Sequence, residues 1–348
     1  MPPLPRPNDA LVENLGENAK RAYVVHILPS EDTAVNANRD SLHIRVLGAL
    51  PIHAPTRQAS EAVAEEIISA NGSYERLDDL GKLYLENFVY FFGSARSRTP
   101  LPTEHPSRLS LSAQRAGIQH ELVQTPQDHS GAKQNALIRD GFRCMLSGEI
   151  EVIVWKASPS AFPDPADTVS VGPTSCCHIL PERTNDAVSS FDNPGSENKP
   201  DRGSALRAVL ARFSGYEDVR KELEGPAAAH QLSNILTLSA KLRTQFEGLE
   251  LWLEALPGQA LRCKEQVHFR VCDVDIPGFP RPSPEYLPLP DPRFLALHAA
   301  CCKVAQMSGA AEYVDKMDRD LEEMQVLGED GGSADVLVYA MSRLLPRG

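Results

Sequence analysis

The chain has 348 residues, of which 42% are hydrophobic and 6% aromatic, and its formal net charge is -12. This length favours about two domains, and the apolar content is sufficient for a core built from Leu, Val, Ala and Ile. The acidic balance argues against a protein that coats nucleic acid without specificity, because the phosphates would repel it. A protein of this charge that acts on DNA needs a local basic patch or a metal ion.

The seven cysteines include two adjacent pairs, Cys176–Cys177 and Cys301–Cys302, and none has CxxC spacing. This pattern predicts neither a disulfide framework nor a zinc ribbon. Reduced thiols favour an intracellular protein, either nuclear or cytoplasmic. We expect no membrane partner, because the sequence opens without an apolar signal region and no apolar run reaches the ~20 residues of a membrane span.

The first 129 residues are expected to be mostly helical. Short apolar runs at residues 23–28 and 41–50 are interpreted as candidate strands, and a helix is expected over residues 58–70. A second, amphipathic helix is indicated by apolar side chains at helical spacing, namely Leu77, Leu80, Tyr84, Phe88 and Phe91. Residues 94–127 are rich in Pro, Ser, Thr and His, which is typical of a linker.

After residue 129 the composition changes several times. The patterns predict, in order, a helix from about residue 130, strands at 142–146 and 151–155, an inserted loop at 183–204, and short helices at 205–212 and 217–223. Prolines make residues 276–292 extended. The apolar residues that follow recur at helical spacing and predict a helical tail.

Two segments carry the clearest signal for function. Residues 176–182 read CCHILPE and place His178 in a short apolar run that Pro181 closes, which predicts the end of a strand. Residues 234–254 read NILTLSAKLRTQFEGLELWLE, which is an asparagine, an alternating strand pattern and then a helical pattern.

Together these segments resemble the HNH nuclease family, in particular the HNH-containing proteins of fungi. The likeness extends to GFRCMLSG at residues 141–148 and to FLALHAACCKVAQMSGAAEYVDKMDRDLEE at residues 294–323, so it covers the chain from about residue 130. The resemblance implies an α+β fold with a ββα-metal module and flanking helical regions. The regions expected are 1–129, mostly helical with the linker; 130–275, the HNH-like nuclease domain with its inserted loop; and 276–348, the Pro-rich linker and helical tail.

The resemblance implies an endonuclease that hydrolyses DNA phosphodiester bonds with a divalent metal, Mg²⁺, Mn²⁺, Ni²⁺ or Zn²⁺. His178 matches the general base, and Asn234 matches the asparagine that orients this base or the connecting loop. The metal would relieve charge on the leaving oxygen, and its candidate ligands are His178, Glu247 and Cys177.

Arg243 departs from the family pattern, because the family commonly has a histidine ligand at this position, and Glu247 stands where aspartate is usual. Two unit charges 4 Å apart interact by ~4 kcal/mol at an effective dielectric near 20, so a guanidinium would oppose a divalent ion by roughly twice that. Arginine also cannot deprotonate to become a ligand. The metal could instead recruit Glu247, Cys177 or His230.

The alternative function is a catalytically inactive HNH-like module that binds nucleic acid or protein. In that case Arg243 contacts a phosphate directly through its fork of donors. A third interpretation is a purely structural helical partner protein in which the hairpin is vestigial. Protein partners are also expected at the helical tail. Each residue also has an ordinary interpretation: His178 as a hydrogen-bonded core histidine, Asn234 as a residue that starts a strand, and Arg243 with Glu247 as a solvated helix pair.

Overall fold

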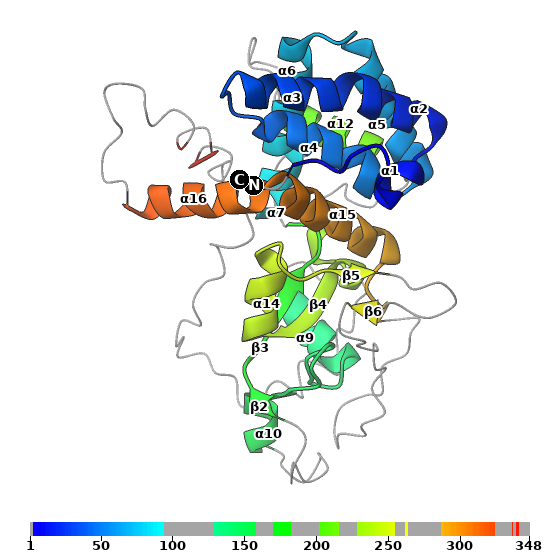
Figure 1. Ribbon diagram of the computed structural model, residues 1–348. Coiled ribbons are helices and arrows are strands. Elements are labelled where there is room, and N and C mark those ends of the chain that lie inside the picture. Colours follow the sequence, from blue (N-terminus) through cyan, green and yellow to red (C-terminus); the bar gives the residue numbers. More distant parts are fainter. Residues whose placement is uncertain are drawn as a thin grey trace, which may run out of the picture. The chain divides into compact units, whose positions relative to one another are not determined.

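The computed structural model describes residues 3–93, 129–157, 170–181, 202–215, 228–254, 262–263 and 287–323, together with residues 336, 339 and 340 (Figure 1). The chain forms two compact units. The helical unit comprises Met1–Ser94, Asp186–Glu224 and Ala296–Gly348, and the hairpin unit comprises Ala95–Asn185 and Gly225–Leu295. Helices combined with small sheets of two strands place the fold in the α+β class in general, as expected.

The helical unit is built from helices that are mostly short. Within the described ranges these are α1 (Ala10–Glu13), α2 (Glu17–Ala22), the π-helix η1 (Tyr23–Ile27), α3 (Leu28–Asn36), α4 (Leu42–His53), α5 (Arg57–Ser69), α6 (Tyr74–Tyr84), the π-helix η2 (Leu85–Val89), α7 (Tyr90–Gly93), α12 (Arg202–Ser214) and α16 (Ala310–Glu323). Helix α15 (Pro292–Ser308) begins in the hairpin unit and continues in the helical unit from Ala296.

The strands expected at residues 23–28 and 41–50 are wrong, because both runs are helical. In α4 all but one of the residues from Leu42 to Pro51 are buried. A helix that is apolar on all sides lacks the polar face that gives a helical period, so its sequence cannot be told from that of a buried strand. The helix expected over residues 58–70 is confirmed as α5, and the helix predicted from an amphipathic period is confirmed as the continuous run α6–η2–α7.

Helix α12 belongs to the helical unit although its residues lie between the two central strands of the hairpin unit in the sequence. Phe213 is fully buried and packs edge-on against Phe88, with ring centroids 4.7 Å apart, and against Tyr84 at 6.4 Å. Arg212 pairs with Glu66 of α5, whose other oxygen accepts a hydrogen bond from the Tyr84 hydroxyl at 2.7 Å. The helix predicted at residues 205–212 is therefore confirmed, as part of the helical core.

The short strands found among the described residues belong to the hairpin unit. Its described elements are α9 (His129–Arg139), β1 (Ile150–Glu151), α10 (Val152–Ala157), β2 (Val171–Gly172), β3 (Thr174–His178), the 3₁₀ turns η7 (Ala228–His230) and η8 (Leu232–Asn234), β4 (Ile235–Ser239), α14 (Ala240–Glu247), β5 (Leu253–Glu254) and β6 (Arg262–Cys263). β1 pairs with β2 in parallel, and β5 pairs with β6 antiparallel.

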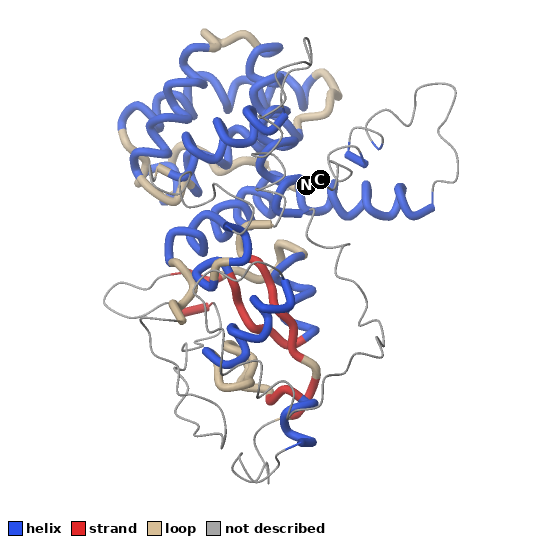
Figure 2. The backbone as a smooth tube through the Cα atoms, turned by 180° about the vertical axis from the view of Figure 1, so that it is seen from behind, coloured by secondary structure: helices blue, strands red, loops and turns tan. Residues whose placement is uncertain are grey.

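The centre of this unit is the antiparallel pair β3–β4, which α14 follows directly. The register sets Thr174 opposite Ser239 and His178 opposite Ile235. All five residues of β4 are buried, so both faces of the pair are covered. Helices α9 and α14 each contact both strands, and Figure 2 shows the two strands running side by side with helices next to them. The predicted strand end at His178 and the predicted strand and helix after Asn234 are confirmed.

The strands expected at 142–146 and 151–155 are corrected by the structure. Residues 144–149 form a tight turn, in which the amide of Cys144 donates to the carbonyl of Glu149 and the amide of Gly148 donates to the carbonyl of Cys144. From Val152 the chain is helical in α10. Local hydrogen bonds around the Ser147–Gly148 turn thus keep the apolar residues at 142–146 out of a regular ladder, although Arg143 makes one bridge to Ile150.

Arg139 holds the hairpin unit together from the end of α9. Its guanidinium is buried and donates hydrogen bonds to the carbonyls of Leu232 and Ile235, both at 2.8 Å, while Asp140 supplies the counter-charge at 2.7 Å. A buried arginine with this many acceptors is satisfied and structural, because each N–H that lost its partner would remain desolvated.

Several expectations lie outside the described residues: the linker at 94–127, most of the inserted loop at 183–204, the helix at 217–223 and most of the Pro-rich stretch at 276–292. Among the helices that the structure does describe, none has the length and apolar character that crossing a membrane requires.

Candidate functional site

Asn234 ties the chain that follows His178 to the start of β4. Its Oδ1 accepts a hydrogen bond from the amide of Leu180 at 2.8 Å, and its Nδ2 donates to the carbonyls of Leu180 and Ala229, both at 3.0 Å. The side chain is completely buried. Among the residues that the structure describes, Asn234 therefore bonds to the connecting loop and not to the ring of His178.

Arg243 and Glu247 form an ion pair one turn apart on α14, with Nε and Oε1 separated by 2.7 Å. The two side chains are only 13% and 11% exposed, so this is not the solvated surface pair of the ordinary interpretation. Within the described ranges Glu247 is the hydrogen-bond partner of Arg243, and the bond uses Nε. No described residue accepts a hydrogen bond from the terminal nitrogens Nη1 and Nη2.

Cys177 lies against this pair from β3, because its Sγ is 3.9 Å from Oε1 of Glu247. Burial raises the pKa of the Cys177 thiol well above its ordinary value, and the Glu247 carboxylate raises it further. Burial also raises the pKa of Glu247, although Arg243 opposes this shift. The thiol is therefore protonated at neutral pH, which makes it a poor metal ligand.

His178 follows Cys177 in the strand and points to the opposite face, since successive side chains of a strand alternate. On this face its Nε2 lies 3.3 Å from Nδ1 of His230, and the ring of His129 has its centroid 5.5 Å away. Three imidazoles, from α9, β3 and η7, therefore meet at one end of the β3–β4 pair.

The environment of His178 keeps its ring neutral. Burial lowers the pKa of His178 to about 3, and the neighbouring His129, His230 and Arg243 lower it in the same direction. A neutral imidazole has the protonation state that a general base needs, but at a pKa of about 3 it has little affinity for the proton it would accept.

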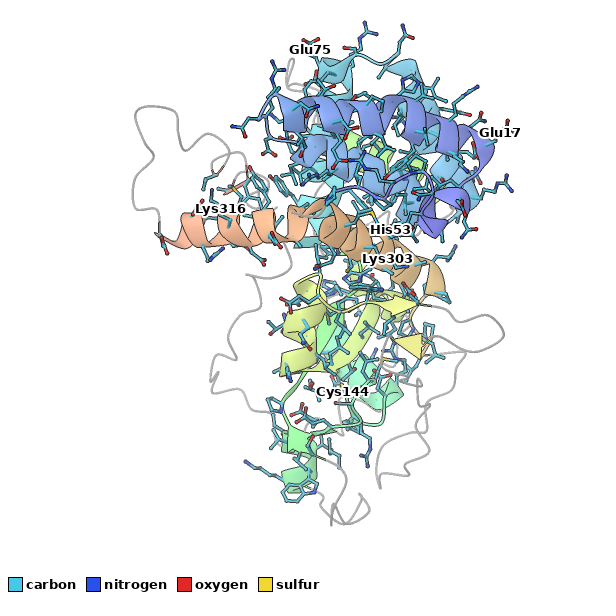
Figure 3. All side chains as sticks on the ribbon, viewed as in Figure 1. Glu17, His53, Glu75, Cys144, Lys303 and Lys316 are labelled. Carbon is cyan, nitrogen blue, oxygen red and sulfur yellow. The ribbon has the colours of Figure 1, made fainter. Side chains whose placement is uncertain are left out.

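Cys144, labelled in Figure 3, lies in the tight turn that follows α9 in the hairpin unit. Its Sγ accepts a hydrogen bond from the amide of Ser147 at 3.4 Å inside the tight turn. Its thiol is buried, and the contact explains it as a turn-stabilising residue.

The candidate metal ligands do not form one coordination site. Cys177 and Glu247 lie on the α14 side of β3, whereas His178 faces His129 and His230 on the other side. In the part of the chain that the structure describes, no three His, Cys, Asp or Glu side chains are arranged to hold a metal ion. A guanidinium paired with Glu247 further disfavours a divalent cation there. Among the described residues, the three ligands that the resemblance implies, Cys177, His178 and Glu247, therefore do not converge on one point.

Sequence reasoning did not find His129 as a member of this group. His129 lies 49 positions before His178 at the start of a helix, and no local spacing links the two residues. His230 was considered only as a replacement ligand, and the structure instead places it in contact with His178. Contacts of this kind depend on how α9 packs against β3, which is a property of the whole hairpin unit.

Comparison with known proteins adds no family assignment: no protein-family model, no curated protein and no solved structure matches this chain.

Proposed function

We propose that the hairpin unit binds the phosphate backbone of nucleic acid through Arg243, using a β–β–α arrangement similar to that of HNH nucleases without their metal chemistry. The observation that carries this proposal is the state of the Arg243 guanidinium. It is 13% exposed, Glu247 holds it through Nε, and its terminal nitrogens have no acceptor among the described residues. Phosphate oxygens are well matched to such a fork of donors.

The local charge around β3 supports the proposal. Burial raises the pKa of the Cys176 thiol to about 12. This rise is opposed by three cations that lie near the thiol, namely Arg139, Lys133 and Arg243. Lys241 adds an exposed cation on α14. Because Asp140 neutralises Arg139, the cations that remain are Lys133 and Arg243 near Cys176 and Lys241 on α14. In a protein whose net charge is -12, these side chains supply local positive charge of the kind that binding to nucleic acid requires.

The proposal is tested by measuring the affinity of the variant Arg243→Gln for labelled duplex DNA, single-stranded DNA and RNA. We expect the affinity to fall by about tenfold or more, since a charge-assisted contact contributes roughly 1.5–3 kcal/mol. The plot of log K against log salt concentration should become less steep, by roughly the amount that one phosphate contact contributes. Arg21→Gln is the matched control, because it removes the same charge from α2 in the helical unit and should leave binding within about twofold. Equal affinities for the two variants would contradict the proposal.

A metal-dependent DNA endonuclease is the second candidate, and the observation that favours it is His178. This imidazole is neutral, ends the first strand of the pair and contacts a second imidazole, as a general base with a partner would. Plasmid nicking in Mg²⁺, Mn²⁺, Ni²⁺ or Zn²⁺ separates the two candidates. Cleavage by the unmodified protein that is lost in His178→Ala would favour the nuclease. Cleavage that appears only in Arg243→His would identify a binding module derived from a nuclease.

A further inference from the structure

The segment Leu4–Arg6, here called the strap, is held on the helical unit in the manner of a bound peptide. The amide of Leu4 donates to Oε1 of Glu31 at 3.1 Å, and the carbonyl of Pro5 accepts a hydrogen bond from the Tyr23 hydroxyl at 2.8 Å. Arg6 pairs with Asp32 at 3.0 Å. Side chains of the helical unit therefore form hydrogen bonds with two main-chain groups of the strap and an ion pair with its one charged side chain.

The Leu4 side chain occupies a hollow that a glycine keeps open. Leu4 is 1% exposed. A Cβ added to Gly48 of α4 would lie 2.7 Å from Cδ1 of Leu4 and 2.7 Å from Cγ2 of Ile27, closer than atoms can pack. Gly48 thus lets a leucine side chain reach the helix backbone, and this gives the hollow selectivity for one large aliphatic residue.

The carboxylate of Glu31 retains binding capacity that the strap does not use. Its Oε1 accepts from both the Leu4 amide and Nε of Arg45, the latter at 2.7 Å. Its Oε2 is buried and has no hydrogen-bond partner among the described residues, and the residue is 1% exposed. A buried carboxylate oxygen without a donor is costly, so an occupant that supplies one further donor would be held more tightly than the strap.

We infer that Tyr23, Glu31, Asp32 and Gly48, here called the cradle, form a recognition site for an extended Leu-Pro-Arg peptide of a partner protein, and that the strap is its internal competitor. The chemistry of the occupant follows from the contacts: a leucine for the hollow, a proline that pre-sets an extended backbone, and a cation for Asp32. Proline-containing peptides lose little entropy on binding in this form, and recognition through main-chain groups with one anchoring side chain is a general mode. The burial that raises the pKa of Tyr23 keeps its hydroxyl protonated as a donor.

The strap competes with a peptide in solution because it belongs to the same chain as the cradle. A tethered ligand acts at an effective concentration in the millimolar range, so a peptide of the same sequence added to the unmodified protein binds weakly. Weakening the strap without shortening the chain should open the cradle to a peptide in solution. The full chain with Leu4→Asp and Arg6→Ala achieves this, since an aspartate cannot enter the hollow beside Glu31.

The test is fluorescence anisotropy with a labelled peptide of sequence PPLPRPND. We expect it to bind the strap-released protein about tenfold or more tightly than the unmodified protein. Asp32→Asn in the released background should weaken binding by several-fold, and a peptide with Asp in place of Leu should not bind. Equal binding to the released and unmodified proteins, or equal binding of the two peptides, would overturn the proposal.

A second measurement covers the case in which the released protein loses helical circular dichroism. Hydrogen exchange of residues 23–32 in the milder variant Leu4→Ala, Arg6→Ala should be faster than in the unmodified protein, and excess peptide should slow it again. Protection that the peptide does not restore would mean that the cradle only packs its own chain, and the inference would fail.

Discussion

Glu247 holds the Arg243 guanidinium through Nε, and no other described residue accepts a hydrogen bond from the outer edge of the fork. The carboxylate that positions this cation therefore also lowers its attraction for any anion. In Glu247→Gln we expect the affinity for oligonucleotides to rise several-fold, because one repulsive charge is removed near the phosphate. The hairpin unit should lose roughly 1–3 kcal/mol of stability, since Arg243 loses its partner in a mostly buried site.

Glu250→Gln is the control for this change. Glu250 is exposed and lies three residues further along the chain, so its substitution should change stability by less than about 0.5 kcal/mol. Titration of both variants with the same labelled duplex measures the effect. A loss of affinity in Glu247→Gln would contradict the role given to Arg243.

His178 should make the hairpin unit sensitive to acid. Its pKa lies near 3 in the folded protein against an ordinary 6.5, so the unfolded chain binds more protons between these values. The neutral imidazole of His178 contributes fully to stability above pH 6.5. As the pH falls toward 3 this contribution is lost, and the free energy of unfolding decreases by at most about 1.4 kcal/mol per pH unit. Between pH 7 and pH 5 the unmodified protein should lose up to about 2 kcal/mol more than His178→Gln.

Urea unfolding followed by tryptophan fluorescence measures this difference. Both tryptophans of the chain, Trp155 and Trp252, belong to the hairpin unit and therefore report on it alone. The same loss in the two proteins would show that the imidazole of His178 titrates normally.

Asn234 should be among the most sensitive positions of the hairpin unit. Asn234→Ala leaves the amide and carbonyl of Leu180 and the carbonyl of Ala229 without their partner in a buried site, and we expect a loss of roughly 2–4 kcal/mol in urea unfolding. Ser233→Ala is the neighbouring control, because the bond that Ser233 accepts from the amide of Asp291 uses its backbone carbonyl. Comparable losses of stability in both variants would contradict a specific role for the hydrogen bonds of the Asn234 side chain.

Phe213 should stabilise the helical unit although its sequence lies among residues of the other unit. Phe213→Ala removes a fully buried ring from between Tyr84 and Phe88, and such truncations cost roughly 3–5 kcal/mol. Hydrogen exchange of peptides from α5 and η2, which pack against α12, should accelerate. Arg212→Ala should have a small effect, because its side chain is 56% exposed and surface ion pairs contribute little.

The sequence predicts best where a period or a cap is visible. The helix expected over residues 58–70 is observed as α5 (Arg57–Ser69), and the structure shows that Thr56 caps it by accepting from the amide of Ala59 at 3.1 Å. The strand after Asn234 is recognisable for the same reason, since Ile235 to Ser239 are followed at once by a helical pattern.

The secondary structure was predicted wrongly where burial on all sides removes the helical period of apolar and polar residues. The run at residues 41–50 is apolar except for Ser41, His43 and Arg45 and forms a helix that is buried on nearly every side. Such burial demands the same residue types as a buried strand would. The candidate site shows the same limit at long range. His178, Arg243 and Glu247 could be singled out from the sequence, whereas the separation of Cys177 from His178 onto two faces and the approach of His129 depend on tertiary packing.

The position of α12 in the sequence constrains the order in which a nascent chain can fold. When β3 leaves the ribosome, its partner β4 has not been synthesised, and the helices made first still lack Phe213. Helix α12 then supplies that ring before Ile235–Ser239 emerges, so the earlier unit gains its missing residue while the later one is still open. Each unit thus depends on a segment translated in the middle of the other, and a pause or truncation between residues 214 and 235 would leave β3 exposed as an unpaired edge.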